Sequence, residues 1–326
     1  MPVACFDLEG PLSPQDNAYE VMGLIPGGKE IFEVISRYDD LLTLEGRQDY
    51  EPGDTLKLIV PFLIRHGITE ADIERVSRRA RIVAGAKETI AHLRRNNWKV
   101  HIISTSYQQH AYNIAAQLGV AGEDVACTRL ELSRYRGISG VELVAEVERV
   151  ILEKLYPRMR DEEIVATLDE FFFKKLPQTE LGKVFNEVRV VGGSRKVEAM
   201  LRFLEEDGAQ LSECAAIGDS ITDFKMLREV SRGGGIAIAF NANEYSLPCC
   251  DIAVASEKLS AILPLLDAFA EGGRSAALEK AGSLEDGQGE AAYTLFPAES
   301  ETKLRRTLRI HSHFRALVRG EAAKLG

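Results

Sequence analysis

The chain has 326 residues, of which 45% are hydrophobic and 28% are charged, a composition typical of one large or two smaller globular domains. Its formal net charge of −10 argues against nucleic acid as a partner, because nucleic acid is itself a polyanion. No apolar run reaches the ~18 residues that a membrane span needs, and the N-terminus lacks the basic segment of a signal peptide. Its five cysteines have no metal-binding spacing and are expected to be reduced, buried thiols. We therefore expect a cytoplasmic protein that contacts neither a membrane nor nucleic acid.

The N-terminal part of the chain predicts one buried strand followed by a long helical segment. Residues 3–8 form an apolar run typical of a strand, whereas residues 14–85 show helical patterns only. An all-helical insert of this length exceeds a plain connection between two strands. We expect residues 14–85 to form a helical cap over the sheet edge, with Glu20, Met22 and Arg65 facing the pocket beneath it.

Further apolar runs at residues 99–104, 214–218 and 235–240, with 251–255 as a candidate fifth strand, are separated by helical periodicity. Buried strands that alternate with helices predict an α/β core with a doubly wound, Rossmann-like, mostly parallel sheet. We assign this core to residues 1–13 and 86–270. A second insert at about 133–190 exceeds the length that one helix and one strand need, and we expect it to enlarge the cap or line the pocket.

The C-terminal part of the chain changes in composition. Residues 271–294 are rich in Gly, Ser, Ala and Glu and predict a linker. Residues 295–326 predict a basic amphipathic helix, with Leu304 and Leu308 among its apolar residues and Arg305, Arg309 and Arg319 on the opposite side. This helix is expected to dock on the acidic body of its own chain; the alternative is a second subunit, in a homo-oligomer, or another protein partner.

Two pairs of acidic residues follow predicted strands. Asp7 and Glu9 leave the first strand two residues apart, and Gly10 then lets the backbone turn and approach an anion closely. Asp219 leaves the strand at 214–218, and Asp223 lies one helical turn further on. Carboxylates crowded at one sheet edge repel each other unless a cation neutralises them, and Mg²⁺ prefers such oxygen ligands. The alternative, that Asp219 and Asp223 merely cap a helix, does not explain the matching pair on another strand.

Hydroxyl and cationic side chains fall near the same edge. Ser104 and Thr105 end the strand at 99–104, where a hydroxyl beside a helix start forms either an anion site or a plain helix cap. Lys196 opens the helix that precedes the Asp219 strand, so its side chain can reach the acidic residues; Arg195 and Lys183 remain alternatives for this role.

In this order the motifs resemble those of the haloacid dehalogenase-like (HAD) phosphatase superfamily. The family pattern is Asp-x-Asp-Gly, a strand ending in Ser or Thr, a Lys, and Gly-Asp-x-x-x-Asp, which here stand as Asp7-Leu8-Glu9-Gly10, Ser104, Lys196 and Gly218-Asp219-Ser220-Ile221-Thr222-Asp223. The resemblance covers roughly residues 3–265 and is nearest the phosphoserine phosphatase branch. The string Asp-Leu-Glu-Gly is similar to that of bifunctional phosphoserine phosphatase/homoserine kinase members, and Asp-x-Glu-Gly also occurs in enolase-phosphatases.

The resemblance implies Mg²⁺-dependent hydrolysis of a small phosphorylated metabolite, a phosphate monoester, through an aspartyl-phosphate at Asp7. It implies a metal site made by Asp7, the Glu9 backbone carbonyl, Asp219 and Asp223, and a phosphate site made by Ser104, Thr105, Lys196 and Gly10. Asp223 would orient a metal-bound water or Lys196. Glu9 would act as general acid and then general base.

Two residues depart from the family pattern. Glu9 stands where the family has Asp and is longer by one methylene, and Pro11 replaces the usual Thr or Ser. A shift of ~1 Å in a catalytic group costs up to about 10²-fold in rate, so Glu9 bears on efficiency rather than on fold. Two other functions remain open: phosphoryl transfer to an acceptor other than water, and a degenerate HAD domain that serves as a binding or regulatory subunit.

Overall fold

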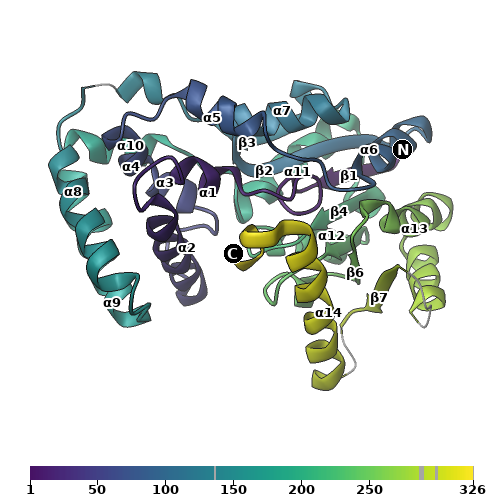
Figure 1. Cartoon of the computed structure of the whole chain (residues 1–326). Helices are drawn as coiled ribbons and strands as arrows, with labels where there is room; N and C mark the ends of the chain where they lie inside the picture. The colour runs from purple at the N-terminus through teal and green to yellow at the C-terminus, as the bar shows by residue number, and fades with distance from the viewer. Residues whose placement is uncertain (136, 286–289, 298–299, 326) are drawn as a thin grey trace.

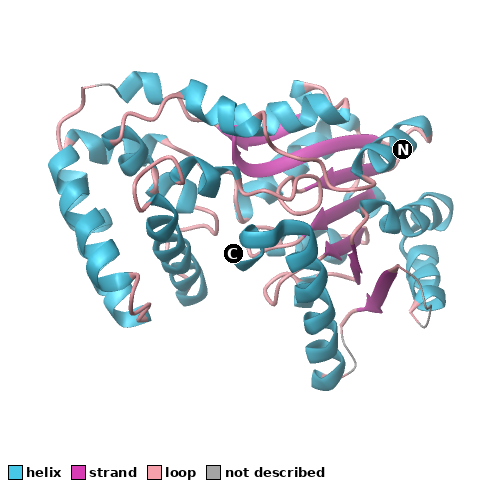
Figure 2. Cartoon of the chain, viewed as in Figure 1, coloured by secondary structure: helices cyan, strands magenta, loops and turns pink. Residues whose placement is uncertain are grey.

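The computed structural model describes residues 1–135, 137–285, 290–297 and 300–325, and within them seven strands form one sheet in the order β3-β2-β1-β4-β5-β6-β7. Neighbouring strands are parallel, apart from the antiparallel pair β6–β7 (Figure 2). The predicted doubly wound α/β sheet is confirmed. The strands are β1 Val3–Phe6, β2 Lys99–Tyr107, β3 Val125–Thr128, β4 Cys214–Gly218, β5 Ile236–Phe240, β6 Ile252–Ser256 and β7 Ala291–Leu295.

Helices cover both faces of the sheet, and the alternation of side chains along β1 shows why. Ala4 and Phe6 pack toward the face covered by α6 (Ala86–Arg95), α7 (Gln108–Leu118) and α13 (Leu263–Leu284). Val3 and Cys5 point to the opposite face, which α11 (Ser194–Asp207) and α12 (Phe224–Arg232) cover. Successive strand residues face opposite sides, so an apolar run such as β1 is buried on both. All five cysteines are free and buried, as expected.

The two inserts pack together as one helical body with its own hydrophobic core, seen on the left of Figure 1. Phe62 of the first insert lies against Phe171 of the second, and Tyr38 stacks on Phe172. Arg47 also pairs with Asp169 at 2.6 Å across the two inserts. We call this unit the helical body; it comprises α1 Asn17–Met22, α2 Gly28–Glu45, α3 Thr55–Leu58, α4 Val60–Arg65, α5 Glu70–Ser77, α8 Val141–Val150, α9 Asp161–Asp169 and α10 Glu180–Glu187.

The linker expected at 271–294 is not observed in its described part. Helix α13 continues to Leu284, interrupted only by a kink at Gly272 and Gly273, and β7 adds an antiparallel edge strand to β6. The Gly pair that suggested a flexible segment is confined to the kink, and the Ala and Glu residues after it are good helix formers. Residues 286–289 of the predicted linker lie outside the described residues.

The C-terminal helix α14 (Glu301–Arg319) is followed by a 3₁₀ turn, Gly320–Lys324, and packs on its own chain against β6. Its most buried side chains recur every four residues: Thr307, His311, Arg315 and Arg319. The expected placement of Arg319 on the face away from the protein is therefore wrong, and Leu304 and Leu308 are only partly buried. The described end of the chain, drawn in yellow in Figure 1, lies beside the helical body, where Glu321 and Lys324 pair with Lys29 and Glu33 of α2. Residues 298–299 and 326 of the predicted tail lie outside the described residues.

Every helix in the described part of the chain is too short or too polar to traverse a lipid bilayer.

Candidate active site

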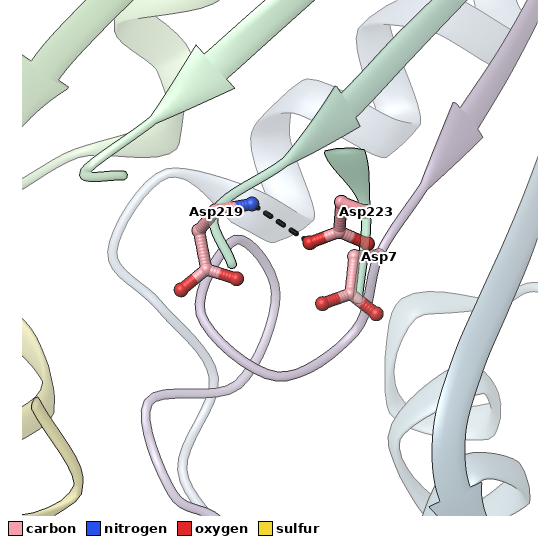
Figure 3. A group of neighbouring side chains, drawn as sticks. All are labelled: Asp7, Asp219 and Asp223. Atoms are coloured by element: carbon pink, nitrogen blue, oxygen red, sulfur yellow. Dashed lines mark hydrogen bonds between the residues drawn. The ribbon is translucent and has the colours of Figure 1, made fainter. Parts of the chain in front are cut away.

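Three buried carboxylates meet where β1 and β4 end side by side. Asp7 directly follows β1, and its N–H donates to the Ile217 carbonyl at 2.8 Å, which continues the β1–β4 ladder by one residue. Asp219 directly follows β4, and Asp223 is the N-cap residue of α12. One oxygen from each carboxylate lies within 4.8 Å of the others (Figure 3). The sequence expectation that these acids converge at one sheet edge matches this arrangement.

Lys196 lies in the first turn of α11 and is fully buried among these carboxylates. Its Nζ donates to Asp7 Oδ1 and to Asp223 Oδ1, both at 2.6 Å. Burial lowers the pKa of Lys196, but the ion pairs with Asp223 and Asp7 outweigh it and raise the pKa above its usual range, so the amine stays charged. Of the two alternatives left open by the sequence, Arg195 pairs with Asp54 at 2.6 Å and Lys183 is exposed.

Asp223 is held mainly by the backbone. Its Oδ2 accepts the N–H groups of Asp219 and Ser220 at 3.0 and 3.1 Å, and its Oδ1 is used by Lys196. Both oxygens therefore have donors within the protein. Of the two roles considered for Asp223, the geometry favours orienting Lys196.

Only one oxygen of the Asp219 carboxylate accepts hydrogen bonds from the described residues. Its Oδ2 accepts from Arg315 and, at 2.8 Å, from Arg319 of α14, whereas the buried Oδ1 has no hydrogen-bond partner among the described residues. Gly10, with φ +114°, packs directly on this carboxylate, and a Cβ at this position would collide with it. The sequence predicts Gly10 as a phosphate-binding residue, but its N–H donates to the Ser13 carbonyl at 2.7 Å and is not available to a phosphate in this conformation.

The donor set fits a divalent cation with hard oxygen ligands. An acceptor buried without a donor is costly unless a ligand or ion satisfies it, and Asp219 Oδ1 is such an acceptor beside Asp7. Asp7 and Asp219 thus have the residue types and the spacing that would hold Mg²⁺.

The carboxyl groups of Asp7 and Glu9 are kept partly protonated by their surroundings. Burial, the largest cause, and the charge of the nearby Asp16 together raise the pKa of Glu9 to about 8, against the lowering effect of the Asn17 N–H that donates to Glu9 Oε1 at 2.9 Å. Burial and the charge of Asp223 raise the pKa of Asp7 to about 7, although Lys196 lowers it. At neutral pH Glu9 therefore carries a proton, while Asp7 is close to its titration point.

His110 of α7 lies beside Glu9, with its Nε2 3.7 Å from Glu9 Oε1. Burial lowers the pKa of His110 to about 3, so the imidazole is neutral. Its Nδ1 bonds to the Ser77 hydroxyl at 3.0 Å, which fixes the ring against the helical body.

A cavity of about 60 Å³ opens in front of Asp7 and Glu9. Thr105 lines it, whereas Ser104 is fully buried and its Oγ accepts the Ser106 N–H at 3.0 Å. Of the two predicted phosphate-binding hydroxyl residues, Thr105 is the one at the cavity. From the helical body the lining consists of Asp16, Phe32, Ser36, Asp39, Asp40, Gly53, Thr55 and Leu56.

The three residues that we expected to face the pocket from the helical body do not line this cavity. Met22 is buried in the core of the helical body, and Arg65 pairs with Glu148 of the second insert at 2.9 Å. Glu20 lies on α1, whereas the cavity is lined mainly by α2 and by the segment around α3. Position along the chain did not indicate which helix face turns inward.

The sequence interpretation also missed Arg315, Arg319 and His110. For the two arginines the available signal was their spacing of four residues on α14, which is equally typical of a solvated helix face. Only their burial against the loops after the strands distinguishes them.

No family model matches this sequence, and no curated protein matches it. Among solved structures, the gene product AF1437 from Archaeoglobus fulgidus is 30% identical with a TM-score of 0.86, and the match covers 100% of this chain and 99% of that chain. A phosphoserine phosphatase with a phospho-aspartyl intermediate analogue is 19% identical with a TM-score of 0.53, covering 80% of this chain and 97% of that chain. A substrate-bound phosphoserine phosphatase is 19% identical with a TM-score of 0.54, covering 80% and 96%.

The chain belongs to the same family as the Archaeoglobus protein, which it matches over its whole length. It has the fold of the phosphoserine phosphatases. Of the motif residues that resemble the HAD pattern, Asp7, Lys196 and Asp219 lie together in the site described above. At the end of β2 the motif residue Ser104 does not line the cavity, and its neighbour Thr105 does.

The raised pKa of Glu9 predicts a pH-dependent stability in the metal-free protein. A carboxyl whose pKa is higher in the folded state stabilises the fold fully below its unfolded pKa, near 4.5, and loses this contribution as pH rises through about 8. We therefore expect Glu9→Gln to melt at a higher temperature than the unmodified chain above pH ~8, with the difference shrinking toward pH ~5. Thermal denaturation in EDTA would measure it, with exposed Glu279→Gln as the control. A difference that does not change with pH would contradict the assignment.

Proposed function

We propose that this protein is a Mg²⁺-dependent phosphatase that hydrolyses a small phosphate monoester through an aspartyl-phosphate intermediate. The observation that carries the proposal is Asp7, a carboxylate at the end of the central strand, bonded to Lys196 and facing the cavity beside Asp219. This arrangement supports attack on an anionic phosphoryl group better than it supports a structural ion pair, because Asp219 Oδ1 has no partner among the described residues.

Asp7 is the nucleophile in this mechanism. One of its carboxylate oxygens forms a bond to phosphorus, and the bond from phosphorus to the leaving-group oxygen breaks, which divides one difficult displacement into two easier ones. Mg²⁺, held by Asp7, Asp219 and the Glu9 backbone carbonyl, would supply positive charge that offsets the repulsion between the Asp7 carboxylate and the phosphate. Lys196 stays charged and holds Asp7 in place.

Glu9 moves the proton in both steps. Its raised pKa, about 8, keeps it protonated at neutral pH, so it can donate to the departing oxygen. It then accepts a proton from the water that attacks phosphorus, and the bond between phosphorus and Asp7 breaks to release phosphate. The Asn17 N–H holds its Oε1 at 2.9 Å, so the longer side chain at this family position has a fixed orientation.

The substrate class follows from the helical body covering the cavity in front of Asp7. The helical body forms the outer wall of the cavity, which measures about 60 Å³ in this conformation, so a macromolecular substrate cannot reach Asp7 and a small one is favoured. The helical body acts as a cap in this proposal, and its movement relative to the sheet would admit the substrate.

The experiment that tests the function is hydrolysis of p-nitrophenyl phosphate with the full chain, with and without Mg²⁺. We expect release of p-nitrophenol with added Mg²⁺, its loss in EDTA and its recovery when Mg²⁺ is restored, because the metal offsets charge in the reaction. Activity that is unchanged by EDTA would contradict the metal-dependent mechanism. Binding of Mg²⁺ and phosphate with no turnover of any tested monoester would favour the regulatory alternative. Turnover that needs an alcohol acceptor would favour phosphotransfer.

A further inference from the structure

Helix α14 brings two guanidinium groups into the active site from the C-terminal end of the chain. Both Arg315 and Arg319 donate from Nη1 to Asp219 Oδ2, and their side chains are only 4% and 5% exposed. Arginine is costly to bury unless its donors are satisfied, so we asked what satisfies the donors of each of these two groups.

The N–H donors of Arg315 are satisfied by acceptors within the protein. Its Nε and Nη2 donate to the carbonyls of Ala323 and Leu325 at 3.0 and 2.9 Å, and its Nη1 also lies near the Asp219 carbonyl at 3.3 Å. It therefore ties the end of the chain to the loop after β4. It does not line the cavity in front of Asp7.

Arg319 differs in both respects. Its Nε is buried without a hydrogen-bond acceptor among the described residues, and the side chain lines the cavity together with Asp7, Glu9 and Thr105. It uses the same Asp219 oxygen as Arg315, so neutralising that oxygen does not by itself require a second guanidinium.

The charge around the cavity indicates what Arg319 does. Five carboxyl groups line it, and among the described lining residues Arg319 is the one cation. Lys196 lies behind Asp7 with its Nζ shared between two carboxylates. A phosphate dianion that enters would meet repulsion from those of these acids that are ionised, and among the described lining residues the cation that faces it is Arg319. The five carboxyl groups are those of Asp7, Glu9, Asp16, Asp39 and Asp40.

We propose that Arg319 is a phosphate-binding residue, supplied by the C-terminal helix, that donates to a non-bridging oxygen of the phosphoryl group. The proposal deepens the function proposed above and rests on it. The planar guanidinium suits this role because it can keep one N–H on Asp219 while another contacts phosphate.

The segment after α14 contacts the helical body next to this arginine. Leu325 lines the same cavity, and ion pairs join Glu321 to Lys29 at 3.0 Å and Lys324 to Glu33 at 2.6 Å, both on α2. These pairs are largely exposed and contribute little stability, so they permit the helical body to move. Arg319 stays anchored to the sheet through Asp219.

The test measures orthophosphate binding calorimetrically with the full chain in saturating Mg²⁺, and separately Mg²⁺ binding alone. We expect Arg319→Met to weaken orthophosphate binding about 10- to 100-fold, the range for a hydrogen bond to a charged group, while the Mg²⁺ affinity stays within about threefold. Arg319→Lys should recover part of the loss, because it keeps the charge and loses the fork. Arg309→Met, an exposed arginine on the same helix, is the control and should bind orthophosphate normally.

Orthophosphate affinity unchanged in Arg319→Met would overturn the proposal. So would a loss that disappears once the weaker Mg²⁺ binding of the variant is allowed for, since Arg319 would then act only through Asp219. If Arg319→Met does not fold, Arg319→Lys decides: a several-fold loss supports the proposal, and normal affinity overturns it. Weaker orthophosphate binding in an enzyme without turnover would uphold this inference and refute the phosphatase function. Turnover by the unmodified chain together with normal orthophosphate affinity in Arg319→Met would uphold the phosphatase function and refute the role of Arg319.

Discussion

Asp7→Asn is expected to abolish hydrolysis of p-nitrophenyl phosphate, because the amide cannot form the aspartyl-phosphate. Removing the nucleophile of a covalent mechanism has cost on the order of 10⁶-fold in kcat where it has been measured. The variant should fold, since Asn has almost the same shape and burial, which raises the pKa of Asp7 to about 7, favours a neutral group there. Steady-state rates and a melting curve would check both expectations.

A matched control for this change is Asp267→Asn, which alters a partly exposed carboxylate that pairs with His92 and does not line the cavity. Its activity should equal that of the unmodified chain. Hydrolysis retained by Asp7→Asn, after contaminating phosphatase has been excluded with the EDTA-treated sample, would eliminate Asp7 as the nucleophile.

Glu9→Gln is expected to slow turnover by about 10²–10⁴-fold, the usual contribution of general acid–base catalysis. The neutral side chain cannot give its proton to the leaving group or accept one from water. Mg²⁺ binding should persist, because the metal would contact only the backbone carbonyl at this position. Rates measured with aryl phosphates of different leaving-group acidity would show the largest loss for the least acidic phenol.

Glu9→Asp tests whether the site is built around the longer side chain. The Asn17 N–H donates to Glu9 Oε1 at 2.9 Å, so a shorter carboxylate would lose this hydrogen bond and its contact with the His110 ring. We therefore expect a slower enzyme. A faster enzyme would indicate that Glu9 is a weakened form of the usual family residue. No effect of Glu9→Gln on either step would reduce the role of this loop to nucleophile and metal ligand.

Much of the core could be predicted from short apolar runs. The runs at 3–8, 99–104, 214–218, 235–240 and 251–255 correspond to β1, β2, β4, β5 and β6, because strands buried on both faces need continuous apolar sequence. The other two strands were missed. β3 has an apolar run of only three residues, 125–127, and β7 is a half-buried edge strand in a segment whose composition resembled a linker.

The sequence by itself determined which residues end the central strands. Asp7 and Asp219 follow apolar runs, and parallel strands bring their carboxyl ends to one edge, so the meeting of these acids followed from pattern alone. Only the tertiary structure decided which cations join them. Lys196 rather than Arg195 reaches Asp7 because of its angular position on the first turn of α11. Arg315 and Arg319 reach Asp219 from nearly 100 residues away because α14 packs across β6, and no local pattern specifies that contact. The same holds for the two inserts, since amphipathic helices record that a face is buried but not which partner buries it.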